Sequence, residues 1–300
     1  MAAQAPTAAA APFELVDIPG KGKGLVATRN LKTGEQILVE TPQIVLPAVE
    51  CTEEAVAAAV AQLSPSDRVA FHSLALADIH EHLGPHHGRF MTNAFEYNMK
   101  GGLCLVGARF NHSCAPNVGR RWDPVTGEVR HVASVDIDKG SELEFCYEGL
   151  FDSKEQRQQA LQRLFGFSCT CPACSLSGDE QLKSDERRVK LEATYHAIGQ
   201  LGIASPIEAA ELVKEAFVLL DEEGLTLGGC TFAQSAFQAA AAWNDYGSAQ
   251  AWALKNLEWQ VREAGVESSD YESVKQDVRN PRTSYWWGAF GDLQQDVPRP

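Results

Sequence analysis

The most specific chemistry in this sequence belongs to three cysteines, Cys169, Cys171 and Cys174, which stand almost side by side. Disulfide geometry is too narrow for three such neighbours all to pair with one another, but their thiolates can point at one cation. A tetrahedral zinc ion takes four such ligands, and Cys114 is available as the fourth. We therefore expect a closed zinc site that contributes folding energy and leaves no coordination position open.

Two further motifs precede the cysteine cluster. The first runs NHSCAPN from Asn111 to Asn117, and the second runs GSELEFCY from Gly140 to Tyr147. Each motif alone is a weak signal, but the order and spacing of all three resemble the SET-domain lysine methyltransferases. The likeness is closest to the SET-and-MYND (SMYD-like) branch and to its fungal relatives that lack the MYND finger. It covers residues 13–174, and no Cys-x-x-Cys pair stands near Cys51, where the finger would interrupt the domain.

The resemblance implies a binding site for S-adenosylmethionine. A glycine-rich turn would lie near the methionine end of this cofactor, and the NHSC motif would contact it through main-chain and side-chain hydrogen bonds. Phe167 corresponds to the aromatic residue that stacks on the adenine. The cofactor-binding residues implied in this way are Gly22, Lys23, Gly24, Asn93, Asn111, His112, Tyr147 and Phe167.

The same resemblance makes Tyr147 the catalytic tyrosine, with its hydroxyl near the transferring methyl group. It also places Phe95 and Phe165 in the wall of the substrate lysine channel. Methyl transfer requires a neutral amine, although a free lysine has a pKa of about 10.4. A narrow apolar channel disfavours the ammonium form and aligns the reacting atoms. Positioning of the reactants and exclusion of water are therefore sufficient for methyl transfer. We identify no convincing acid–base constellation in the sequence.

Phe165 departs from the family pattern, because many relatives have a second tyrosine at that position. Loss of the hydroxyl frees space and removes an acceptor in the channel, so the number of methyl groups added stays open. Two alternatives to lysine methylation also stay open. One is a SET-fold scaffold that binds partners with little catalysis, and the other is an enzyme that modifies a small molecule through the same pocket.

The composition describes an ordinary soluble protein, with 44% hydrophobic and 22% charged residues in a chain of 300. The net charge of −14 disfavours direct binding to nucleic acid and suits a basic, lysine-containing protein, although it could equally serve solubility alone. Residues 1–12 lack the features of a signal peptide, and the longest uncharged run, 225–244, indicates a buried helix rather than a membrane span. We expect a monomer in the cytoplasm, the nucleus or both.

An α+β fold must bring these motifs together. The resemblance implies a β-rich SET domain, residues 13–178, with small sheets around a pseudoknot-like core, preceded by a disordered tail at residues 1–12. Short apolar runs broken by turn residues predict strands at 13–16, 24–28 and 34–40. Residues 118–137 predict a meander whose hairpin tip is 123–127.

Helical periodicity predicts the remaining elements. Residues 53–63 and 65–82 would form helices of an insert at about 51–90, and a basic helix at 153–165 would open the post-SET zinc segment at about 151–178. Residues 179–280 are predicted to be helical throughout. Pairs of helices of this size resemble tetratricopeptide-type packing, although the consensus of that repeat is not evident. The helices predicted there are 180–201, 205–220, 231–243 and 248–264. We expect residues 281–300 to form a tail that frays.

Overall fold

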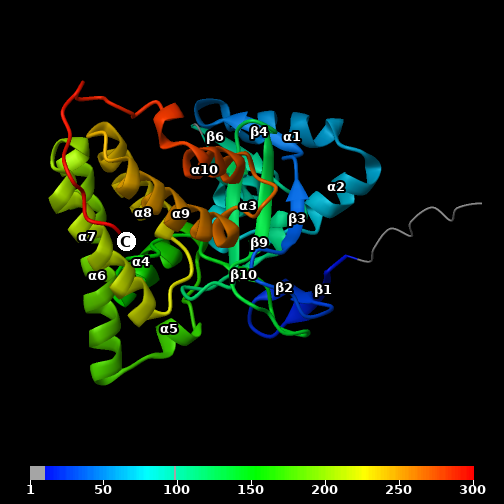
Figure 1. Cartoon of the computed structure of the whole chain (residues 1–300). Helices are drawn as coiled ribbons and strands as arrows, with labels where there is room; N and C mark the ends of the chain where they lie inside the picture. The colour runs from blue at the N-terminus through cyan, green and yellow to red at the C-terminus, as the bar shows by residue number, and fades with distance from the viewer. Residues whose placement is uncertain (1–10, 98) are drawn as a thin grey trace, which may run out of the picture.

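The computed structural model describes residues 11–97 and 99–300 (Figure 1). The predicted tail at residues 1–12 therefore lies almost wholly outside the described residues. Helices α6 and α7 lie at one edge of the molecule and α1 and α2 at the other, with the small sheets between them. In the described part of the chain, no helix is both long and apolar enough to cross a membrane.

A hairpin begins the SET part of the fold. Strand β1 (Phe13–Ile18) pairs antiparallel with β2 (Gly22–Ala27) in unbroken register, which confirms the two strands expected here. The turn between them contains Gly20, and both Gly20 and Gly22 have a φ of 77°, in the left-handed region that glycine tolerates best. The inner face of β2 contributes Leu25 and Ala27 to the core.

Two three-stranded antiparallel sheets follow, with the strand orders β3-β9-β8 and β4-β6-β5. The expected hairpin at 118–137 is the β8–β9 pair, and its tip is fixed by Asp123, whose Oδ1 accepts bonds from the amides of Val125 and Thr126. The strand bounds are β3 (Gln36–Glu40), β4 (Ile44–Pro47), β5 (Phe95–Tyr97), β6 (Lys100–Leu103), β8 (Val118–Asp123) and β9 (Glu128–Ala133).

The pseudoknot-like core is made by two very short strands that run parallel. Strand β10 (Glu144–Phe145) pairs with β7 (Asn111–His112), so the two predicted motifs lie side by side. The amide of Leu143 donates to the carbonyl of Leu25 at 2.8 Å, which bonds the same segment to β2 on its other side. Segment 142–145 is thus held between β2 and the NHSC loop, and the expected SET-type α+β fold is confirmed.

The helical insert consists of α1 (Glu53–Gln62), α2 (Pro65–His72), a 3-10 turn η2 (Asp78–Leu83) and α3 (His87–Asn93). The prediction of one helix over 65–82 was wrong, because α2 ends at His72. The carbonyls just beyond it have no helical partner and instead accept bonds from side chains distant in sequence. These pairs are Arg109 with Ser73, Arg89 with Leu74, and Asn93 with Ala75.

The helical C-terminal region follows two short helices, α4 (Lys154–Phe165) and α5 (Pro172–Ser175). All four predicted helices of this region are present within a few residues, and each packs on the next around the buried Trp252. A fifth helix, α10, lies in the part of the predicted helical region 179–280 for which no separate helix was delimited. The bounds are α6 (Gly178–Leu201), α7 (Pro206–Glu223), α8 (Gly229–Ala242), α9 (Tyr246–Glu263) and α10 (Ser269–Arg279).

Residues 281–300 do not fray as expected but pack against α8 and α9. Val297 is buried, and its amide donates to Asp245 Oδ2 at 2.8 Å. The indole of Trp252 donates to the carbonyl of Pro298 at 2.8 Å. The scarcity of apolar residues predicted a loose tail, but polar side chains of α9 bond its backbone instead.

One buried arginine, Arg188, joins the helical region to the SET domain. Arg188 of α6 is almost fully buried, and its Nε donates to Glu223 Oε1 at 2.7 Å. The same guanidinium donates to the carbonyl of Cys114 at 2.9 Å and to that of Leu150 at 2.6 Å. A single side chain therefore connects α6, α7, the NHSC loop and the segment before α4.

We predict that Arg188→Met lowers the free energy of unfolding by about 3 kcal/mol, because it leaves a buried carboxylate and two carbonyls short of a donor. Urea denaturation followed by tryptophan fluorescence measures the change. Lys190→Met is the matched control, since Lys190 pairs with Glu215 on the exposed face of the same helix and should change stability by less than about 1 kcal/mol. Equal effects of the two substitutions would contradict this role for Arg188.

Candidate active site

Tyr147 lies two residues after β10, at the crossing of the SET core. Its hydroxyl donates to the carbonyl of Phe110 at 2.7 Å, and its amide donates to Nδ1 of His112 at 2.9 Å. Burial raises the pKa of Tyr147 well above its ordinary value. The phenol is therefore neutral over the physiological range, and its oxygen is held in one place.

Two cavities meet at Tyr147. The first, here called the aromatic pocket, is a cavity of about 280 Å³ walled by rings. The second, here called the loop pocket, is a cavity of about 380 Å³ between the β1–β2 turn and the loop that leads into the cysteine cluster. The rings of the aromatic pocket belong to Phe95, Phe110, Phe145, Tyr147 and Phe165, and the loop pocket is lined by residues that include Gly20, Lys21, Asn111, His112, Tyr147 and Phe167.

Most of the predicted site residues fall into these two cavities. Asn111, His112 and Phe167, expected at the cofactor, line the loop pocket, whereas Phe95 and Phe165, expected at the substrate, line the aromatic pocket. Only Tyr147 among these lines both. The predicted residues are thus sorted into two groups on the two sides of one phenol.

Asn93 lies apart from the other residues expected at the cofactor. It lines the aromatic pocket, and its amide nitrogen donates to the carbonyls of Ala75 and Arg89, each at 2.7 Å. In this structure, then, Asn93 ties the end of α3 to the segment after α2.

The predicted turn Gly22-Lys23-Gly24 touches the site through its backbone. Asn111 Nδ2 donates to the carbonyl of Lys23 at 3.3 Å and to Glu142 Oε1 at 2.8 Å. A Cβ atom on Gly24 would lie 2.6 Å from that nitrogen, so only glycine fits there. The Lys23 side chain points away and pairs with Asp17.

Lys21 is a site residue that we did not predict. Its ammonium lies 2.9 Å from Glu142 Oε2 and also pairs with Glu144, at the edge of the loop pocket. Burial alone would lower the pKa of Lys21, but the bonds to these carboxylates outweigh burial and raise it. The glycine-rich turn contains two lysines, Lys21 and Lys23, and the sequence does not show which of them faces the pocket.

His112 is buried and bonded on both nitrogens. Burial lowers the pKa of His112 to about 4, so the ring is neutral. Because Nδ1 accepts the Tyr147 amide, the proton is on Nε2, which lies 3.2 Å from Cys114 Sγ. His112 therefore links the tyrosine to the cysteine cluster.

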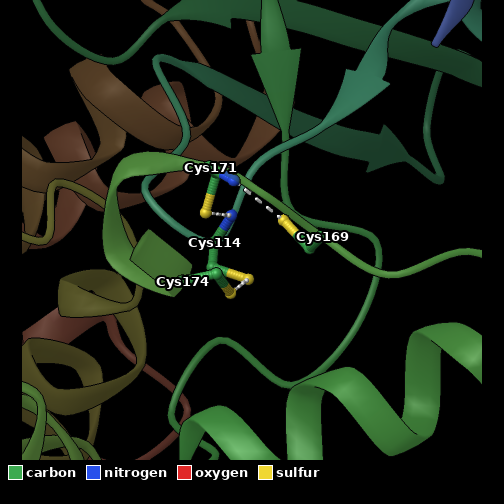
Figure 2. A group of neighbouring side chains, drawn as sticks. All are labelled: Cys114, Cys169, Cys171 and Cys174. Atoms are coloured by element: carbon green, nitrogen blue, oxygen red, sulfur yellow. Dashed lines mark hydrogen bonds between the residues drawn. The ribbon is translucent and has the colours of Figure 1, made fainter. Parts of the chain in front are cut away.

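The four predicted cysteines converge as expected (Figure 2). Their sulfur atoms all lie within 4.8 Å of one another, and all four residues are buried. Four sulfurs at about 2.3 Å from a tetrahedral zinc lie about 3.8 Å apart, and the Cys114–Cys174 pair is 3.5 Å apart here. The fully buried Arg157 places Nη2 4.0 Å from Cys174 Sγ, where a positive charge offsets thiolates. The donor set and its surroundings fit a metal ion such as zinc.

Charged residues in the aromatic pocket are a second feature that we missed. Arg120 of β8, Glu96 of β5 and Glu148 all line it, together with the buried His131. Burial lowers the pKa of His131 to about 3, so that ring is neutral. The expected channel is therefore aromatic but carries a guanidinium and two carboxylates.

Comparison with known proteins gives matches to SET-domain methyltransferases. The pattern that defines the SET domain matches residues 22–148. The histone-lysine N-methyltransferase set5 of Schizosaccharomyces pombe is 30% identical over 275 residues, which cover 90% of this chain and 85% of that protein. The protein-lysine N-methyltransferase SMYD4 of Homo sapiens is 35% identical over 97 residues, 31% of this chain and 12% of its own length. The solved structure of the Neurospora SET domain protein DIM-5, a histone lysine methyltransferase, has a TM-score of 0.25 and 20% identity over 46% of this chain and 52% of that chain.

The fold and the paired cavities define a SET-domain protein. With the match to set5 over nearly the whole chain, the protein belongs to the SET-domain family of which the fungal Set5 methyltransferases are members. The resemblance inferred from the three motifs is thereby confirmed.

We predict that Asn117→Ala loosens the segment that leads to Tyr147. The Asn117 amide donates to the carbonyl of Glu142 at 2.8 Å and accepts from the amide of Glu144 at 2.9 Å. Loss of both bonds should cost about 2 kcal/mol and speed hydrogen exchange at the Glu144 amide. Amides of the β3–β9 ladder serve as the internal control. Unchanged protection at Glu144 would show that Asn117 does not hold this segment.

Proposed function

We propose that this protein is a protein-lysine N-methyltransferase that uses S-adenosylmethionine. The observation that carries the proposal is the position of Tyr147 as the wall shared by the loop pocket and the aromatic pocket. In such a transferase the methyl donor and the amine bind in separate sites, and their reacting atoms must be aligned where the two sites meet.

The loop pocket is the proposed cofactor site. Asn111, His112 and Phe167 all line it, so that polar groups and an aromatic ring are available to a nucleoside. Glu142 and Glu144 hold Lys21 at the rim, where its charge can meet the carboxylate of an amino acid. When S-adenosylmethionine is bound there, it supplies the methyl group for the transfer.

The aromatic pocket is the proposed lysine channel. Phe95, Phe145 and Phe165 provide apolar walls for an alkyl chain, and they exclude water from its end. At the inner end the Tyr147 oxygen is fixed by its bond to the Phe110 carbonyl, so that it can orient an amine without changing its own protonation state. Phe165, whose ring centroid lies 5.0 Å from that of Tyr147, completes the wall.

The substrate that we propose is a basic segment of a protein, as the names of the relatives suggest. Glu96 and Glu148 at the pocket would attract such a segment, and the overall charge is −14. We further propose a monomer of the cytoplasm or the nucleus that binds no nucleic acid directly, since phosphates would be repelled.

We also propose that Cys114, Cys169, Cys171 and Cys174 hold a structural zinc ion. A closed site of four thiolates leaves no position for a substrate. Its role would be to fix the loop that carries Phe167 against the NHSC motif, so that the loop pocket exists at all. Arg157 would reduce the repulsion among the thiolates.

We predict that Tyr147→Phe lowers kcat for methyl transfer to a lysine peptide by about a hundredfold, because one oriented hydroxyl is lost from the reacting centre. Transfer of label from radiolabelled S-adenosylmethionine measures the change. Tyr97→Phe is the matched control, since the Tyr97 ring stacks on Trp122 outside both cavities.

Three results would contradict the proposal in different ways. Cofactor binding without transfer to any protein would favour a scaffold. Transfer to a small molecule alone would favour the other alternative. Equal activity of the wild type and the Tyr147→Phe variant would remove Tyr147 from the reaction.

We predict that purified protein contains one zinc ion per chain, and that Cys171→Ser loses the ion and several kcal/mol of stability, as zinc ligation is coupled to folding. Elemental analysis and thermal unfolding measure the two effects. Cys51→Ser is the control, because Cys51 is a half-buried cysteine of the insert. Wild-type protein purified without zinc, or a Cys171→Ser variant as stable as the wild type, would contradict a structural zinc.

A further inference from the structure

Arg120 occupies an unusual position for a positive charge. Its guanidinium carbon lies 4.5 Å from the ring centroid of Phe145 and 5.4 Å from that of Phe95, between two walls of the aromatic pocket. Phe145 in turn lies 5.0 Å from the ring of Tyr147. The side chain is exposed to the cavity, but its surroundings are dense enough that burial lowers the pKa of Arg120. It nevertheless stays charged, as arginine does in proteins.

No carboxylate neutralises this guanidinium directly. Among the residues that the structure describes, none places a carboxylate within salt-bridge distance of Arg120, whereas the next residue, Arg121, pairs with Asp270 at 2.7 Å. The two arginines point to opposite faces of β8, as neighbours in a strand do. Arg120 is therefore a fixed positive charge that faces the pocket and is held by aromatic rings.

The pocket also contains two carboxylates, those of Glu96 and Glu148. Glu96 and Glu148 are exposed residues, and burial raises the pKa of Glu148 while Arg120 lowers it. Burial also keeps the imidazoles and the thiol of the pocket neutral near pH 7, as it does the phenol. The other titratable side chains that face the pocket are His80, Glu96, Cys104, His131, Tyr147 and Glu148.

We propose that Arg120 is a further functional residue of this pocket, whose positive charge keeps the entering lysine amine in the neutral form that methyl transfer requires. The inference rests on the proposed lysine methylation. Glu96 and Glu148 attract the ammonium group to the pocket, and the guanidinium, held against the Phe145 ring that contacts Tyr147, disfavours the charged form beside that phenol. As the amine moves inward, it releases one proton to water. Its lone pair then forms the new N–C bond as the methyl C–S bond of the sulfonium breaks, and the thioether S-adenosylhomocysteine leaves with the electron pair of that bond.

The test is the pH dependence of kcat at saturating lysine peptide, which reports the protonation of the bound amine, compared between the wild type and Arg120→Met. Removal of the positive charge should raise the pKa of the bound amine, so the rising limb of the profile should move to higher pH by about one unit. We expect about a tenfold loss at about pH 8 and near-equal activity at about pH 10. Arg120→Lys, which keeps the charge, should restore the wild-type profile.

Two matched measurements separate this role from a structural one. Arg121→Gln should leave the profile unchanged, because Arg121 faces away from the pocket. A peptide with S-aminoethylcysteine, whose amine is less basic than that of lysine, should be methylated by Arg120→Met with a smaller loss than the lysine peptide.

Two outcomes would overturn the inference and leave the proposed function intact. One is a loss of the same size at every pH, which would mean that Arg120 binds an anionic group of the substrate or only packs. The other is an unshifted profile for Arg120→Met with full activity. An inactive wild type would instead defeat the proposed function, and this inference with it.

Discussion

The loop from Asn111 to Asn117 is bonded to segments that are far from it in sequence, and the site depends on this convergence. Segment 142–145 pairs with it in a parallel ladder, and Asn117 bonds that segment again from the side. Arg188 of α6 donates to the Cys114 carbonyl, and the amide of Cys114 donates to Cys171 Sγ at 3.4 Å. The SET core, the cysteine cluster and the helical region therefore all contribute hydrogen bonds that hold this loop.

This convergence explains why Tyr147 can be fixed at the end of so short a strand. β10 has only two residues, which by itself would not hold a side chain in place. Instead, the amide of Tyr147 is bonded to His112 and its hydroxyl to Phe110, so both ends of the residue are anchored to the strand and turn that lead into the same loop. Buried Arg157 and Arg188 are costly to desolvate, and each is placed where it supports that loop.

The residues that carry chemistry were easier to predict than the contacts that position them. The cysteine cluster could be inferred because ligand spacing is a local property, and α6 to α9 because helical periodicity is local too. The end of α2 could not, since the carbonyls beyond it are bonded to Arg89, Arg109 and Asn93 from later segments. Arg120 was missed for the same reason: in the sequence it is one of two adjacent arginines, and only the strand register decides which one faces the pocket.

A crystal structure with S-adenosylhomocysteine and a lysine peptide tests the central claim most directly. The account predicts the adenosyl group in the loop pocket and the lysine side chain in the aromatic pocket, with sulfur and amine on the two sides of the Tyr147 phenol. Both ligands in one cavity, or a lysine bound away from Tyr147, would contradict it.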